Sequence, residues 1–131
     1  MQIPTNFRIQ SIRFGIPNEW YANESYAGTN SNIEVAFNSM GRNCSTGNLD
    51  KSFAAGDWMK FEKHELGDCR DFEIETDKLS VFINNKGSNA LMVKEFHVFG
   101  IGRIPRMLKC YLPDEKEEYW VENESLKLKC S

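Results

Sequence analysis

Short runs of alternating apolar and polar residues recur along this chain, and turn-forming residues separate them. The clearest runs lie at residues 33–37, 72–74, 79–83 and 91–99. Side chains of a β-strand point alternately to the two faces of a sheet, so this period-two pattern predicts strands that bury one face. Turn signals recur about every 8 to 14 residues, a spacing typical of sandwiches. We therefore predict an all-β fold, an antiparallel sandwich of two sheets.

The alternation also indicates local features of the strands. The run at residues 7–16 slips in phase at Gln10 and Ser11, as a strand does at a β-bulge. His97 stands out of phase with its apolar neighbours in the run at 91–99, so we expect it to face the solvent. The one helix candidate, residues 62–66, is too short to be stable by itself in water.

The C-terminal part of the chain contains two further alternating runs. Their apolar side chains share one face in each run: Leu108, Cys110 and Leu112 in the first, and Leu126, Leu128 and Cys130 in the second. Antiparallel pairing would bring the two faces together and set Cys110 opposite Cys130. We expect residues 1–100 to form the sandwich and residues 101–131 to form a disulfide-linked β-hairpin packed on it, in one structural unit.

The four cysteines are even in number and contain no C-x-x-C pair, which argues against a zinc ribbon or a redox motif. Four cysteines allow three connectivities. Pairing Cys44 with Cys69, and Cys110 with Cys130, closes the shortest loops, and each bridge would stabilise the fold by about 3 kcal/mol. We predict this connectivity.

Three N-x-S sequons, at Asn23, Asn43 and Asn123, are candidate glycosylation sites. Together with the even number of cysteines they predict a secreted, extracellular glycoprotein. The alternative is a cytosolic protein with four unrelated thiols.

The overall charge constrains the partner. With a net charge of −3 and a pI near 5.4, and with basic residues scattered among acidic ones, the sequence argues against nucleic acid as a ligand. The same balance predicts no general attraction to anionic lipid, so membrane contact would need inserted aromatic residues or a bridging cation. No apolar run approaches the roughly 18 residues of a transmembrane segment.

Three stretches, in this order, carry a family resemblance. Residues 27–35 read A-G-T-N-S-N-I-E-V, residues 53–57 read F-A-A-G-D, and residues 79–99 form a strand pair around an Asn- and Gly-containing turn. This order resembles the PLAT (lipoxygenase-homology) domain over residues 7–100. The resemblance implies an eight-stranded β-sandwich that binds lipid surfaces or proteins, in some members with calcium. Asn30 stands where that family commonly has an acidic residue.

Catalytic motifs are weak in this sequence. His64 precedes Cys69 by five residues and could serve a thiol nucleophile, but Cys69 is assigned to a disulfide. The glycines at 100 and 102 are followed by Pro105 where a phosphate loop needs its last glycine, so residues 100–105 are interpreted as a connector. We predict no catalytic site and no enzymatic activity.

Four aspartates flank the first predicted disulfide: Asp50, Asp57, Asp68 and Asp71. Calcium takes several oxygen ligands from adaptable loops, so a calcium site is conceivable there. They do not form the D-x-D-x-D-G pattern, and we interpret them as solvated turn residues. No cofactor and no metal are predicted.

Large aromatic residues in polar stretches are the best candidates for a binding surface: Trp20, Tyr21, Tyr26, Trp58, Tyr119 and Trp120. Aromatic rings offer contact area at low entropic cost, although rings in loops can also cover the ends of a core. We therefore predict a binding module that contacts lipid or a membrane-associated partner through loop aromatics. The alternative is a secreted ligand, effector, toxin component or inhibitor that binds an extracellular protein.

Overall fold

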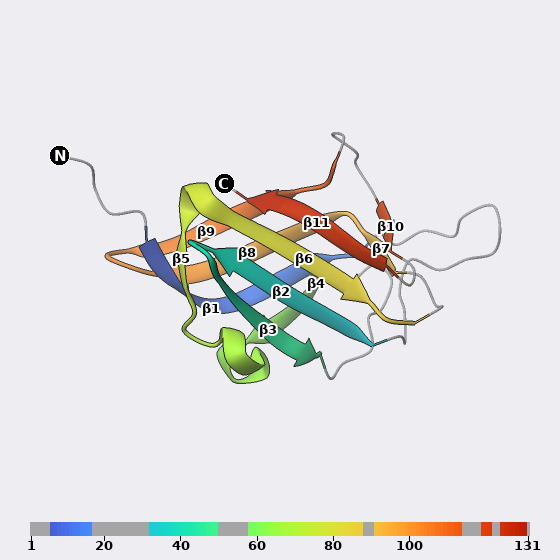
Figure 1. Cartoon of the computed structure of the whole chain (residues 1–131), viewed down its shortest axis with the longest axis horizontal. Coiled ribbons are helices and arrows are strands. Elements are labelled where there is room, and N and C mark those ends of the chain that lie inside the picture. The colour runs from blue at the N-terminus through green and yellow to red at the C-terminus, as the bar shows by residue number, and fades with distance from the viewer. Residues whose placement is uncertain are drawn as a thin grey trace.

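The alternating runs form antiparallel strands. The structure, a computed structural model, describes residues 6–16, 32–49, 58–87, 91–113, 119–121 and 124–130. Eleven strands and three short 3₁₀ helices lie in these residues: β1 (Asn6–Gly15), β2 (Ile33–Ser39), β3 (Arg42–Asn48), β4 (Trp58–Glu62), η1 (Lys63–Glu65), η2 (Gly67–Cys69), β5 (Glu73–Glu75), η3 (Thr76–Lys78), β6 (Leu79–Asn85), β7 (Leu91–Val93), β8 (Glu95–Ile101), β9 (Pro105–Tyr111), β10 (Tyr119–Val121) and β11 (Glu124–Cys130) (Figure 1). The prediction of an all-β antiparallel fold is confirmed.

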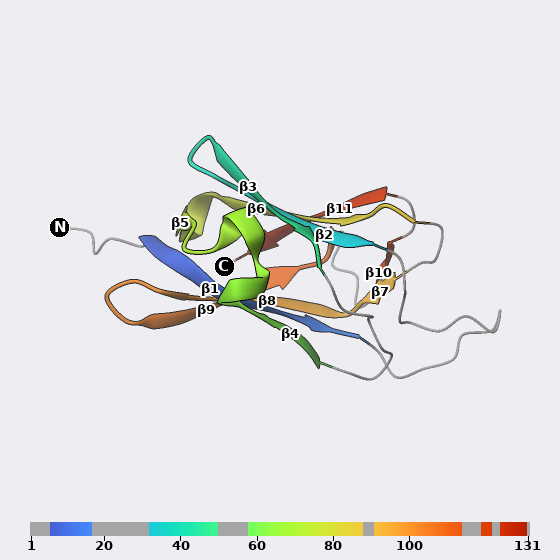
Figure 2. The same cartoon turned by 90° about the horizontal axis from the view of Figure 1, so that it is seen from below.

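The main sheet curls back on itself. Within the described residues its strand order is β3-β2-β6-β11-β9-β8-β1-β4, with β5 also paired to β1, while β7 and β10 form a separate two-stranded sheet. Figure 2 shows the β3-β2-β6-β11 half on one side and the β9-β8-β1-β4 half on the other. The halves are joined where β11 pairs with β9, at Lys129–Tyr111 and Cys130–Cys110. Hydrogen bonding therefore runs through a single curled sheet where two separate sheets were expected.

The core lies between the two halves and is rich in phenylalanine. Phe14 on β1 makes edge-to-face contacts with Phe96 on β8 and Phe61 on β4, with ring centroids 4.9 Å and 6.0 Å apart. All three rings are buried. The predicted bulge is confirmed, because the register of β1 against β8 shifts between Ile9 and Ser11. The extra residue lets β1 keep an apolar face toward the core on both sides of the shift.

Both predicted disulfides are confirmed. Cys44 on β3 is bonded to Cys69 on η2, and Cys110 on β9 is bonded to Cys130 on β11. Gly67 begins η2 at a positive φ of 53°, and a Cβ there would lie 2.6 Å from the carbonyl oxygen of Thr46. Only glycine accommodates both the left-handed backbone and this close approach to β3.

Two predictions of connectivity need correction. The C-terminal runs meet as expected at Cys110 and Cys130, but β9 pairs mainly with β8 and β11 mainly with β6. They are therefore interior strands of the sheet rather than the two arms of a separate hairpin. The run at 91–99 is divided at Lys94, because β7 pairs with β10 while β8 pairs with β1. The boundary at residue 100 stays a prediction.

Among the described residues, no helix has the length and apolar character required to traverse a lipid bilayer.

Candidate functional site

The outer surface of the β9-β8-β1-β4 half carries most of the exposed apolar side chains in the described residues. Of the six large apolar residues that are exposed, all but Met40 belong to β4, β8, β9 or the β8–β9 turn. The alternation of these strands buries Phe61, Phe96 and Leu108 and turns their neighbours outward. We call this surface the cationic face and define it by eleven outward-facing residues: Arg13, Trp58, Lys60, Glu62, Glu95, His97, Phe99, Ile101, Met107, Lys109 and Tyr111.

Basic side chains form one row across this face. In the strand register, Lys60 on β4 stands opposite Arg13 on β1, Arg13 stands opposite His97 on β8, and His97 stands opposite Lys109 on β9. Directly opposed residues on one face of a sheet have their Cβ atoms about 4.5–5.5 Å apart, and like charges in such positions repel one another. Four consecutive strands thus contribute one basic residue each to a single line.

Arg13 is held at the centre of the row by aromatic rings. Its guanidinium carbon lies 4.3 Å from the ring centroid of Trp58 and 5.3 Å from that of Phe99. One terminal nitrogen donates a hydrogen bond of 2.8 Å to Nδ1 of His97. The Nε atom is buried and has no hydrogen-bond partner among the described residues. Arg13 is therefore oriented by cation–π contacts while one of its donors stays unused.

Trp58 covers the middle of the row. Its ring stacks on the imidazole of His97 with centroids 5.5 Å apart and an interplanar angle of 28°. It can lie flat on the sheet because the residue opposite is Gly15, where a Cβ would come within 3.0 Å of the indole. Despite these contacts Trp58 remains 52% exposed. Trp58 is thus an outward-facing aromatic residue with a fixed orientation.

The prediction that His97 is a solvent-facing residue was wrong in one respect. Its side chain points to the outer surface, yet it is only 6% exposed, because Trp58, Arg13 and Phe99 cover it. Burial, followed by the positive charge of Arg13, lowers the pKa of His97; Glu95 opposes this shift and Lys109 adds to it. Arginine can only donate, so Nδ1 accepts and the neutral ring carries its proton on Nε2.

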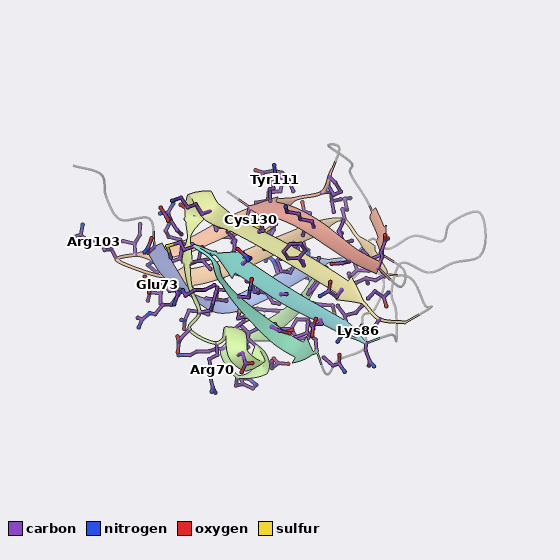
Figure 3. All side chains as sticks on the ribbon, viewed as in Figure 1. Arg70, Glu73, Lys86, Arg103, Tyr111 and Cys130 are labelled. Carbon is purple, nitrogen blue, oxygen red and sulfur yellow. A yellow bond between two sulfur atoms is a disulfide. The ribbon has the colours of Figure 1, made fainter. Side chains whose placement is uncertain are left out.

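The β8–β9 turn extends the apolar part of the face, and sequence reasoning missed it. Ile104 is 65% exposed, and Ile101 and Met107 beside it are exposed as well. Arg103 and Arg106 are also exposed. Figure 3 places Arg103 at the far end of this hairpin, at the side of the molecule where β1 begins. The sequence alone predicts a connector over residues 100–105, and the available signal for an exposed contact turn is the mixture of isoleucine (Ile101, Ile104) and arginine (Arg103, Arg106) in and next to this stretch.

The outer surface of the other half is different. There Asn84 donates to Glu34, at 2.9 Å, and Lys86 lies 3.4 Å from the same carboxylate. The hydrogen bond from Asn84 is the main cause that lowers the pKa of Glu34. Glu34 is thus paired with a basic residue there, while Lys127 and Lys129 on β11 are exposed basic residues of the same half.

Several predicted site residues lie outside the described part of the chain: Trp20, Tyr21, Tyr26, Asn23, Asn123, Asp50 and Asp57. Tyr119 and Trp120 belong to β10, which pairs with β7, and their side chains are likewise outside it. Asn43 is an exposed residue of β3 that accepts a hydrogen bond from Asn38. Of the predicted contact residues, Trp58 is therefore the one whose surroundings are known, and its role in binding stays a prediction.

The other chemical candidates do not converge on a site. Cys69 is bonded to Cys44, and the side chain of His64 is 79% exposed beside Glu65. Hydrogen bonds from Lys63 and then Gln10 lower the pKa of Asp71, while Asp68 is exposed. The described residues contain no group of three or more His, Cys, Asp or Glu side chains that could hold a metal ion.

Comparison with solved structures shows which known fold this chain resembles. Two crystal structures of deletion variants of a LOX (lipoxygenase) protein, one with a further substitution, superpose on it with a TM-score of 0.64 at 14% identity. The matches cover 94% of this chain and 16% of each lipoxygenase chain. The chain has a PLAT-like fold. The predicted resemblance to the lipoxygenase-homology domain is thus confirmed at the level of fold. No protein-family model matches the chain, and no curated protein matches it either.

Proposed function

We propose that this chain is a non-catalytic binding module that contacts a lipid surface through its cationic face. The observation that carries the proposal is the gathering of exposed apolar residues there, with Trp58 at one end of the face and Ile104 at the β8–β9 turn. A cluster of exposed apolar residues on one surface marks an interaction site. Tryptophan is favoured at membrane–water interfaces, because the ring is apolar and its N–H is polar.

The basic residues support an anionic lipid surface in particular. The net charge of −3 argues against general attraction, but in the folded chain Arg13, Lys60 and Lys109 share one face and Arg103 adjoins it. Each Lys or Arg close to an anionic leaflet contributes about 1 kcal/mol. Local charge, rather than net charge, governs such contact within a Debye length of about 10 Å.

A secreted setting belongs to the same proposal. All four cysteines are paired, and disulfides persist mainly in oxidising compartments. The exposed Asn43 is compatible with glycosylation, and it lies on β3, in the half of the sheet opposite the cationic face. A glycan there would leave the proposed contact surface open.

A protein partner is the second candidate, and the composition of the face favours it. Tryptophan, tyrosine, methionine and arginine are enriched in protein interfaces, and the face contains all four. The chain covers 16% of the length of the lipoxygenase chains it superposes on, so in those chains the matched fold occurs together with further protein.

Vesicle co-sedimentation tests the lipid proposal. We expect the chain to sediment with vesicles that contain an anionic lipid, and Trp58→Ala to lose most of that binding. Phe82→Ala is the matched control, because Phe82 is a partly buried aromatic residue on the outer surface of the other half. Thermal melts monitored by circular dichroism verify that both variants fold. If the wild type sediments with no vesicle, with or without calcium, the lipid proposal fails and the protein partner becomes the working hypothesis.

A further inference from the structure

The row of basic residues has an electrostatic cost, which the neighbouring acidic residues offset at its ends only. Lys60, Arg13 and Lys109 carry positive charges, and burial, Arg13 and Lys109 lower the pKa of His97, which lies between the last two. Opposed like charges on one sheet face destabilise a strand pair. An anion bound to the row would reverse the sign of that contribution.

Nearby acidic residues offset the positive charge at the two ends of the row but not at its centre. Glu62 lies 3.5 Å from Lys60, and Glu95 lies 3.8 Å from Lys109. Both contacts are long and solvent-exposed, and such ion pairs contribute little. None of the ion pairs among the described residues includes Arg13, the most buried charge of the three.

The contacts that orient the Arg13 side chain also suit it to bind an oxyanion. The rings of Trp58 and Phe99 and the hydrogen bond to His97 fix the guanidinium plane, so little side-chain entropy remains to be lost on binding. Guanidinium donors form a planar fork that matches the oxygens of phosphate. The lysines on either side are flexible point charges that can close on the same group.

We propose that Arg13, Lys60 and Lys109 form a binding site for a phosphomonoester, presented by a lipid headgroup at the surface that Trp58 contacts. This deepens the proposed function and rests on it for the source of the phosphate. A phosphomonoester carries about −1.5 to −2 charges near neutral pH, which suits three cations better than the single charge of a phosphodiester does. Trp58 would lie beside the headgroup, at the depth where indole rings settle in bilayers.

The first experiment uses inorganic phosphate on the intact chain. We expect the Arg13 side-chain N–H signals in ¹H–¹⁵N spectra to shift in a saturable way with phosphate, and not with chloride at equal ionic strength. Arg13→Gln should weaken phosphate binding by about tenfold or more, since it removes a charge-assisted donor pair. The double variant Lys60→Gln/Lys109→Gln tests the same site from exposed positions and guards against misfolding of the first.

Lys127→Gln is the matched control. Lys127 is an exposed lysine on β11 whose Nζ lies 5.9 Å from the ring of Phe82, so it has the same chemistry on the other half of the sheet. Phosphate binding should be unchanged in this variant. Equal weakening by Lys127→Gln and by the Lys60/Lys109 pair would mean that phosphate responds to net charge alone, and would overturn the proposal.

The second experiment separates the two sources of phosphate and the two proposals. Vesicles of phosphatidylcholine with phosphatidic acid, which presents a phosphomonoester, are compared with vesicles of equal charge that contain phosphatidylserine. Preference for phosphatidic acid that is lost in Arg13→Gln supports the site. Equal binding to both lipids overturns the phosphate site while the lipid-binding function stands. Saturable binding of inorganic phosphate without any vesicle binding supports the site for a soluble phosphate and overturns the lipid function.

Discussion

Removing the Cys110–Cys130 bond tests how the curled sheet is held closed. These residues pair β9 with β11 at the place where the two halves of the sheet meet, and the strands share only one further residue pair there, Lys129 with Tyr111. The perturbation is the double variant Cys110→Ala/Cys130→Ala, which leaves no unpaired thiol. The bond should therefore stabilise both the closed loop and the junction of the halves.

The magnitude follows from the loop that the bond closes. A separation of 20 residues gives a chain-entropy contribution of about 3.3 kcal/mol at 25 °C, and the separation of 25 residues for Cys44–Cys69 gives about 3.5 kcal/mol. Cys110 and Cys130 are both buried, so loss of their sulfur atoms adds a cavity contribution. We expect the variant to lose about 3 to 4 kcal/mol, a large share of the 5 to 15 kcal/mol typical of a domain.

Urea unfolding followed by tryptophan fluorescence measures this loss. Wild-type protein reduced under native conditions provides the comparison, since it loses the cross-links without losing any side-chain volume. Cys44→Ala/Cys69→Ala should lose a similar amount, because the loop lengths are close. A loss below about 1 kcal/mol for Cys110→Ala/Cys130→Ala would refute the reasoning, because the loop-closure entropy alone predicts more.

Three further predictions concern single residues. The pKa of His97 is lowered in the folded chain, so the unfolded chain takes up a proton at this residue first as the pH falls through the ordinary value of about 6.5. The free energy of unfolding should therefore decrease as the pH falls, and His97→Gln should remove this dependence of the urea midpoint on pH. Gly67→Ala should lower the free energy of unfolding by more than 1 kcal/mol in the same assay, because its Cβ would meet Thr46 at a positive φ. Phe96→Ala should lower it by about 3 to 5 kcal/mol, as expected for a buried ring at the centre of the phenylalanine cluster; a loss below 1 kcal/mol would contradict the packing described.

Strands with an alternating pattern could be predicted from the chain alone. β2 and β6 begin where their apolar runs begin, at Ile33 and Leu79, and the phase slip in β1 marks its bulge. The disulfide connectivity was predicted from loop length. These features are local, and local periodicity and short loop closure are properties that a sequence carries directly.

The strands without such a pattern could not be predicted. β3 reads R-N-C-S-T-G-N and contains few apolar residues, yet it forms a strand because β2 offers it an edge and Thr46 accepts a hydrogen bond from the backbone of Val35. β7 and β8 read as one run but have different partners, β10 and β1. Strand partners are chosen by long-range packing, which overrides local propensity.

The candidate site, like the fold, could be predicted from the sequence only in part. The sequence alone identified Trp58 as a contact candidate, from its place beside a turn, and it established a β-rich chain with two short disulfide loops. Only the tertiary structure brought Arg13, Lys60 and Lys109 into one row, buried His97 beneath Trp58 and gathered the apolar residues of β8 and β9 on the same face. The reason is physical: Arg13, Lys60 and Lys109 are dozens of positions apart along the chain, and their proximity depends on the order and register of four strands, which no local pattern encodes.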